Sequence, residues 1–86
     1  MPDPGTCEPV LSAKAVRFLH SLTKPKQRRL ITLLFRIADY PNQLGDYQSS
    51  DDTGRYVQHL MIGDLLVSYW ADHAGKELRI VEIEEV

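Results

Sequence analysis

The spacing of apolar residues changes near Pro41, from a helical period to the pattern typical of strands. Before this proline, two amphipathic stretches predict helices over about residues 12–22 and 24–40. Ser12 is a good N-cap for the first helix, and Pro25 fits the first turn of the second, where its missing N–H is not needed. Because the connection between them is short, we expect the helices to form an antiparallel hairpin.

The second half of the chain has the composition of strands joined by tight turns. Residues 55–62, 65–70 and 76–84 are rich in apolar, β-branched and aromatic side chains. Gly63 and Asp64 make a two-residue turn between the first two segments, which favours an antiparallel hairpin. The sequence therefore predicts three consecutive antiparallel strands after the helices.

The last of these segments changes its hydrophobic phase partway along. Leu78 and Ile80 share one face of a regular strand, whereas Val81 and Ile83 share the opposite face. Such a change indicates a β-bulge or a strand that is covered on both sides. Together with the helices, the pattern predicts an α+β domain, with a helical hairpin packed on a twisted antiparallel sheet of three to four strands.

At 86 residues, the chain is expected to form a single domain spanning residues 1–86. Residues 1–8 are polar and contain two prolines, which predicts a flexible arm. Residues 8–11 can add a short strand, which Pro9 restricts to an edge of the sheet. A further short strand is possible at residues 46–48.

Composition excludes several classes of protein. The apolar share of 43% and the charged share of 26% are ordinary for a globular domain. No apolar run approaches the ~18 residues of a membrane span, and the first residues do not resemble a signal peptide. One cysteine, Cys7, cannot form an internal disulfide or a cysteine-based metal site. We therefore expect a cytoplasmic protein with no cofactor, no metal and no membrane association.

Charge is distributed unevenly along the chain. Residues 1–40 contain seven Lys and Arg against three acidic residues, a net charge of +4. Residues 41–86 contain three against nine, a net charge of −6. The asymmetry indicates two surfaces with different partners, unless the fold intermixes the charges in space.

The candidate catalytic residues are Arg55, His59 and His73. His59 lies four residues after Arg55 in an expected strand, so the two side chains point to one face. His73 follows Asp72 in a turn, and a neighbouring carboxylate stabilises a protonated imidazole. The alternative is structural: Asp72 binds nearby backbone, Arg55 pairs with Asp52, and the histidines lie at the surface.

Four segments of the chain follow the pattern of one known family of proteins. PVLSAKA at residues 9–15 and FLHSL at residues 18–22 are similar to the start of these proteins. GDLLVSY at residues 63–69 is similar to the family's Gly-Asp-Tyr-Arg-Val-x-Tyr segment, and KELRIVEI at residues 76–83 to its last strand. The chain thus resembles RelE/ParE-type toxins, the toxin halves of bacterial toxin–antitoxin pairs, over roughly residues 9–84. This resemblance implies a RelE/ParE-like fold, an antitoxin partner or a homodimer, and a role such as plasmid stabilisation.

The sequence departs from the family at the positions used for RNA cleavage. The arginine of the Gly-Asp-Tyr-Arg segment is Leu66 here, and basic positions of the preceding strand fall near His59 and Met61. Carboxylates stand where a C-terminal His or Tyr is expected, namely Glu82, Glu84 and Glu85. If the protein cleaves RNA, we expect Arg55 to hold the phosphate and His59 or His73 to move protons.

Two hypotheses about function follow. In the first, the protein is the toxin-like component of a type II toxin–antitoxin system and acts on translation by ribosome-dependent cleavage of mRNA. In the second, it is a non-enzymatic binding protein of the same fold, either similar to a gyrase inhibitor or inactive, which works through protein–protein contacts. The acidic second half predicts weak direct binding to nucleic acid, because carboxylates repel phosphates.

Overall fold

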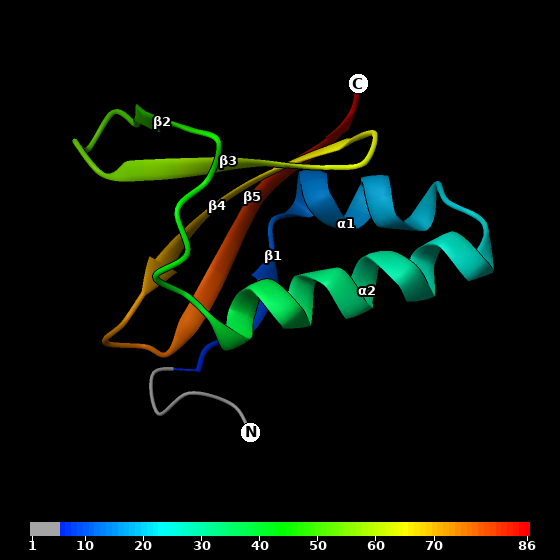
Figure 1. The fold of residues 1–86 in the computed structure, drawn as a ribbon, viewed down its shortest axis with the longest axis horizontal. Coiled ribbons are helices and arrows are strands. Elements are labelled where there is room, and N and C mark those ends of the chain that lie inside the picture. Colours follow the sequence, from blue (N-terminus) through cyan, green and yellow to red (C-terminus); the bar gives the residue numbers. More distant parts are fainter. Residues whose placement is uncertain (1–5) are drawn as a thin grey trace.

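The computed structural model describes residues 6–86 as two helices packed on a five-stranded sheet (Figure 1). Along the chain the elements are β1 (Glu8–Leu11), α1 (Ala13–His20), α2 (Lys24–Asp39), β2 (Tyr47–Ser50), β3 (Tyr56–Ile62), β4 (Leu65–Asp72) and β5 (Glu77–Glu85). The strand order is β1-β5-β4-β3-β2. The predicted α+β class, with a helical hairpin followed by an antiparallel meander, is confirmed.

The sheet nevertheless differs from the prediction in the number of its strands and in the direction of one of them. Both optional short strands form, so the sheet has five strands and not three or four. The first of them, β1, lies at the edge as its proline requires, but it pairs parallel to β5 and not antiparallel. A four-residue strand carries too little pattern to reveal which distant strand it will join, or in which direction.

Part of the predicted arm belongs to the folded domain. Cys7 is buried, and its N–H donates to the carbonyl oxygen of Ala38 at the end of α2 over 2.9 Å. Glu8 is already the first residue of β1. The rest of the predicted arm, at residues 1–5, lies outside the described residues.

The helices form the predicted antiparallel hairpin, as Figure 1 shows. Ser12 is the N-cap of α1, where its Oγ accepts from the N–H of Ala15 at 3.1 Å. The same hydroxyl donates to the carbonyl of Val81 in β5 at 2.7 Å, which ties the start of α1 to the sheet. Pro25 lies in the first turn of α2, as predicted. The first helix ends at His20, slightly before the predicted limit.

A bulge in β5 explains the phase change of its sequence. Ser68 of β4 lies opposite Glu82, but the next residue, Tyr69, lies opposite Ile80. Val81 is therefore an extra residue in β5, and this residue is 40% exposed. Of the two alternatives that the sequence left open, a β-bulge or a strand covered on both sides, the structure has the bulge.

The hydrophobic core lies between the helices and one face of the sheet. Leu78, Ile80 and Ile83 all reach it, because the bulge returns Ile83 to the side of the other two. The helices contribute buried apolar residues that are spaced by about one turn. The core consists of Cys7, Ala15, Leu30, Leu34, Ile37, Ala38, Val67, Tyr69, Leu78, Ile80 and Ile83.

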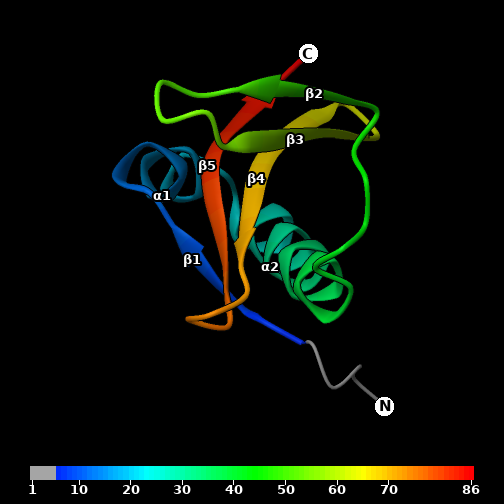
Figure 2. The ribbon, with the colours of Figure 1, turned by 90° about the vertical axis from the view of Figure 1, so that its left-hand side faces the viewer.

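The sheet is strongly twisted. Figure 2 shows β2 and β3 across the top of the view, whereas β4 and β5 run down its centre. The loop that leads into β2 passes close to β3 at Gly45, where a Cβ would lie 2.5 Å from the carbonyl oxygen of His59. Only glycine fits this approach, which fixes β2 beside the middle of β3.

Candidate functional site

One face of the sheet points away from the core, and we call it the open face. Side chains alternate along β4, so the burial of Val67 and Tyr69 in the core places Ser68 and Trp70 on the open face. The cross-strand register then adds residues of β3 and β5 to the same face. Its principal polar and aromatic members are His59, Ser68, Trp70, Arg79, Glu82 and Glu84.

His59 is at the centre of a small polar network on the open face. Its Nε2 lies 2.7 Å from the Oγ of Ser49 in β2, and its Nδ1 lies 2.8 Å from the Oγ of Ser68 in β4. The ring of Tyr47 stacks on the imidazole at a centroid separation of 4.5 Å and an interplanar angle of 9°. The orientation of the ring is thus fixed by three side chains, as acid–base chemistry requires.

Arg55 lies on the same face as His59, as predicted. Its guanidinium carbon is 3.7 Å from the centroid of the Trp70 ring, a cation–π contact. Trp70 shares its side of β4 with Ser68, the residue that contacts His59. The open face therefore brings together a group that can bind an anion and a group that can move a proton.

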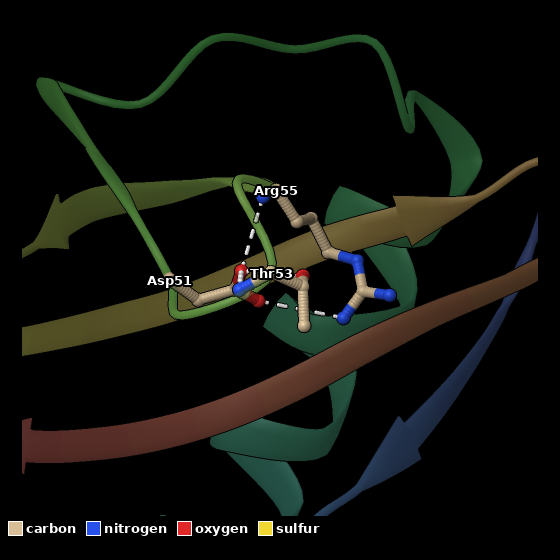
Figure 3. A network of polar contacts seen from close by, with 3 residues as sticks. All are labelled: Asp51, Thr53 and Arg55. Atoms are coloured by element: carbon tan, nitrogen blue, oxygen red, sulfur yellow. Dashed lines mark hydrogen bonds and ion pairs between the residues drawn. The ribbon is translucent and has the colours of Figure 1, made fainter.

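The position of Arg55 is set by the turn between β2 and β3 (Figure 3). Oδ1 of Asp51 accepts from the hydroxyl of Thr53 at 2.6 Å, from the N–H of Thr53 at 2.9 Å and from the N–H of Arg55 at 3.0 Å. The ion pair of Arg55 is therefore with Asp51, at 3.4 Å, and not with Asp52. The hydrogen bond from the Thr53 hydroxyl, above all, holds the pKa of Asp51 below its usual range.

The structure does not bring His73 to Arg55 and His59. His73 is exposed in the turn between β4 and β5, beyond Asp72, which ends β4. Four residues separate Ser68, beside His59, from Asp72, which is roughly 13 Å along a strand. Oδ1 of Asp72 accepts from the N–H of Gly75 at 3.0 Å, so the structural interpretation of this carboxylate is confirmed.

Tyr69 is also outside the open face. It is fully buried on the core side of β4, and its hydroxyl donates to the carbonyl of Gln43 at 2.9 Å. Burial raises the pKa of this phenol. Tyr69 therefore anchors the loop before β2.

Two carboxylates and one lysine form the β5 side of the open face. Nζ of Lys14 in α1 lies 2.6 Å from Oε1 of Glu82. The hydrogen bond with Lys14, and after it one with Glu84, lower the pKa of Glu82. The pKa of Glu84 is raised, chiefly by its hydrogen bond with Glu82 and by the charge of that carboxylate. As the pH falls, Glu84 is the first of the two to take up a proton.

Three members of the network around His59 were absent from our predictions, namely Tyr47, Ser49 and Ser68. Ser68 is two residues before Trp70 in an expected strand, so alternation alone places these two on one face. The contribution of β2 depends on its pairing with β3, where Tyr47 lies opposite His59. No sequence pattern reveals that pairing.

Residues 6–86 contain no group of three or more His, Cys, Asp or Glu side chains arranged to hold a metal ion. In the same part of the chain, neither helix combines the length and the apolar character that crossing a bilayer requires.

The fold is similar to that of two solved structures. A chain of the toxin–antitoxin complex RelBE2 from Mycobacterium tuberculosis superposes with a TM-score of 0.78 at 14% identity, covering 100% of this chain and 98% of that one. A chain of the archaeal RelE–RelB complex from Pyrococcus horikoshii OT3 has a TM-score of 0.68 at 19% identity, covering 93% and 94%. No protein-family model matches, and no curated protein is similar in sequence. The chain therefore has a RelE-type toxin fold.

Proposed function

We propose that this protein is the toxin-like component of a type II toxin–antitoxin pair, with an antitoxin as its partner in the cytoplasm. The proposal depends on one observation, the shared fold, because both similar structures come from complexes of this kind. The likeness extends over at least 93% of this chain and 94% of each neighbour, so it concerns the whole domain and not a common substructure.

The helical layer offers a surface for such a partner. Ile31 and Phe35, one turn apart on α2, are 41% and 54% exposed. Arg28 and Lys24 lie on the same side of the helix, one and two turns before Ile31. An acidic amphipathic helix would cover the apolar pair and match the flanking charges. If a second copy of the protein bound here through its own α2, basic residues would face basic residues.

Expression in a bacterial host tests the role. We expect the protein alone to arrest growth, and the product of a small adjacent gene to restore growth and to co-purify with it. The variant Phe35→Glu should lose the partner, whereas Thr32→Glu, which adds the same charge beside the apolar pair but removes neither of its members, should lose less. Unchanged growth with no adjacent partner gene would contradict the proposal.

For the activity, we propose ribosome-dependent cleavage of mRNA at the open face. His59 would accept the proton of a ribose 2′-hydroxyl as that oxygen attacks the adjacent phosphorus, and Arg55 would bind the non-bridging oxygens. The shared face and the fixed imidazole support these roles. His73 enters the same proposal only as a second proton carrier, since it lies exposed in the turn after β4, away from the other two residues.

A non-enzymatic function has its own supporting observation. Glu82 and Glu84 share the open face with His59, and among residues 6–86 the one ion pair that involves either carboxylate is that of Lys14 with Glu82. This charge balance disfavours RNA, which suits a protein that inhibits a target such as DNA gyrase through protein contacts. The two proposals differ in their product: cut mRNA in one case, and loss of supercoiling with intact mRNA in the other.

A cleavage assay on translating ribosomes separates these activities. If the protein is a ribonuclease, His59→Ala should lower the cleavage rate by about 10²-fold or more, the usual contribution of a general acid or base. His73→Ala should have a smaller effect. Full activity of the double variant would eliminate both imidazoles, and absence of cleavage alongside gyrase inhibition would favour the binding protein.

A further inference from the structure

Ser49, His59 and Ser68 form a continuous chain of hydrogen-bonding side chains across three strands. The Ser49 hydroxyl is exposed and 2.7 Å from Nε2 of His59, whereas Nδ1 of the same ring is 2.8 Å from Ser68. A hydroxyl, a base and a group that orients the base are the parts of an activated nucleophile. We propose that Ser49 is a nucleophilic hydroxyl that accepts an acyl group from an activated carboxylic ester.

Ser68 gives the imidazole its orientation. It lies directly opposite His59 in the register of β3 and β4 and is only 6% exposed, so its hydroxyl has little access to water. In the tautomer with the proton on Nδ1, that N–H donates to Ser68 and leaves Nε2 free to accept from Ser49. The stacked ring of Tyr47 holds the imidazole in this plane.

Charges on the same face favour both stages of the reaction. Glu82 lies opposite Ser68, so its carboxylate shares the face on which His59 takes up the proton. Arg55, held over Trp70 on the same face, supplies the positive charge that an oxyanion needs. This arrangement uses groups from the β2–β3 hairpin and from the central strands, all within the described domain.

Apolar surface is present on this side of the sheet in two places. A shallow hollow beside Trp70 is lined by Val10 of β1, Arg79 of β5 and the bulged residue Val81. The second is the exposed ring of Tyr47, which stacks on His59 and lies closer than the hollow to Ser49, so it suits an aryl or short alkyl ester. Repulsion from Glu82 also disfavours anionic donors.

The step is an ordinary acyl transfer. Oγ of Ser49 attacks the ester carbonyl while its proton passes to Nε2 of His59. The tetrahedral intermediate collapses, the bond from the carbonyl carbon to the alkoxy oxygen breaks, and the imidazolium returns the proton to that oxygen. The products are O-acyl Ser49 and one free alcohol. The inference goes beyond the proposed function and needs neither RNA nor an antitoxin.

The experiment uses the purified full chain and p-nitrophenyl acetate, with the acetylated position mapped by peptide mass spectrometry. Ser49 should be acetylated at least about 10²-fold faster than Ser50, its exposed neighbour on the opposite side of β2. His59→Ala should reduce the rate at Ser49 to that of Ser50. Ser68→Ala should lower it as well, because the imidazole loses its orienting partner.

Two measurements keep the result independent of folding and of background reaction. Circular dichroism establishes that each variant is folded, and Ser50→Ala should leave acetylation of Ser49 unchanged. Acetylation of Lys14 or other lysines reports the background of the reagent. Equal rates at Ser49 and Ser50 in the wild type, or an unchanged rate at Ser49 in a folded His59→Ala variant, would overturn the proposal.

Discussion

Lys14 in α1 and Glu82 in β5 form an ion pair with an Nζ–Oε1 distance of 2.6 Å. The contact joins the basic helical layer to the open face of the sheet. The pKa of Lys14 is raised, mainly by its hydrogen bond with Glu82, and the same contact lowers the pKa of Glu82. Glu84, the second carboxylate, has a raised pKa, chiefly because of its hydrogen bond with Glu82 and the charge of that carboxylate.

The first prediction concerns the pH dependence of stability at Glu84. Its folded pKa lies above the unfolded value, so its contribution is complete below about pH 4.3 and is lost as the pH rises through the folded pKa. Glu84→Gln should therefore raise the melting temperature near pH 7 and leave it unchanged near pH 3. Thermal unfolding across this range is the measurement. Glu85→Gln, the same charge change one residue along, is the control, and an equal rise there would indicate a net-charge effect.

The second prediction concerns nucleic acid. We expect the purified wild type to bind bare RNA weakly at physiological salt, because Glu82 and Glu84 oppose phosphates. The variant Glu84→Lys should bind RNA more tightly and with a steeper salt dependence, whereas Asp52→Lys, in the turn before β3, should have less effect. Filter binding at several salt concentrations measures both, and light scattering gives the oligomeric state. Tight, salt-sensitive RNA binding by a wild-type monomer would contradict this prediction.

Much of the open face could be predicted from alternation along single strands, and little from pairing between strands. The common face of Arg55 and His59 follows from their spacing of four residues. The contact between Ser49 and His59 depends on the register of β2, which is set partly by the passage of Gly45 against β3. His73 does not lie beside Arg55 and His59, because it follows Asp72 at the far end of β4. Composition alone does not show how far apart residues lie along a strand.

The third prediction tests the close approach of Gly45 to β3. Gly45→Ala places a Cβ 2.5 Å from the carbonyl oxygen of His59, so the loop before β2 must move. We expect a loss of about 1–3 kcal/mol of stability and a shifted NMR resonance of the His59 ring. Gly54→Ala is the control: its φ of +82° is strained for alanine, but no atom lies within 4 Å. That variant should lose stability without moving the His59 resonance.

The fourth prediction uses the single tryptophan of the chain as a reporter. Arg55→Ala removes the guanidinium 3.7 Å from the Trp70 ring and should change the emission of Trp70, at a cost of about 0.5–1 kcal/mol. Arg79→Ala is the matched control, because Arg79 lies opposite Trp70 in the register but pairs with Glu77 at 2.7 Å. Identical spectra for wild type and Arg55→Ala would show that the cation–π contact is not populated in solution.

The fifth prediction concerns the anchor beneath the loop before β2. Tyr69→Phe removes the hydrogen bond to the carbonyl of Gln43 but keeps the buried ring, so we expect a loss of about 1 kcal/mol. Urea unfolding measures it. Hydrogen exchange should increase in the loop at residues 41–46 and not in α2. If hydrogen exchange instead increased evenly over the whole domain, Tyr69 would have a packing role only.

The extra residue in β5 determines the chemistry of a whole surface. Without the bulge at Val81, Glu82 would lie opposite Val67 and Ile83 opposite Leu66. The residues of β5 after the bulge would then exchange sides, with Glu82 toward the core and Ile83 on the open face. The insertion of one residue thus lets the same short run of amino acids serve as core or as charged surface. Insertions and deletions at this position therefore offer a route by which related chains could change which residues of the last strand face the core and which face the open side of the sheet.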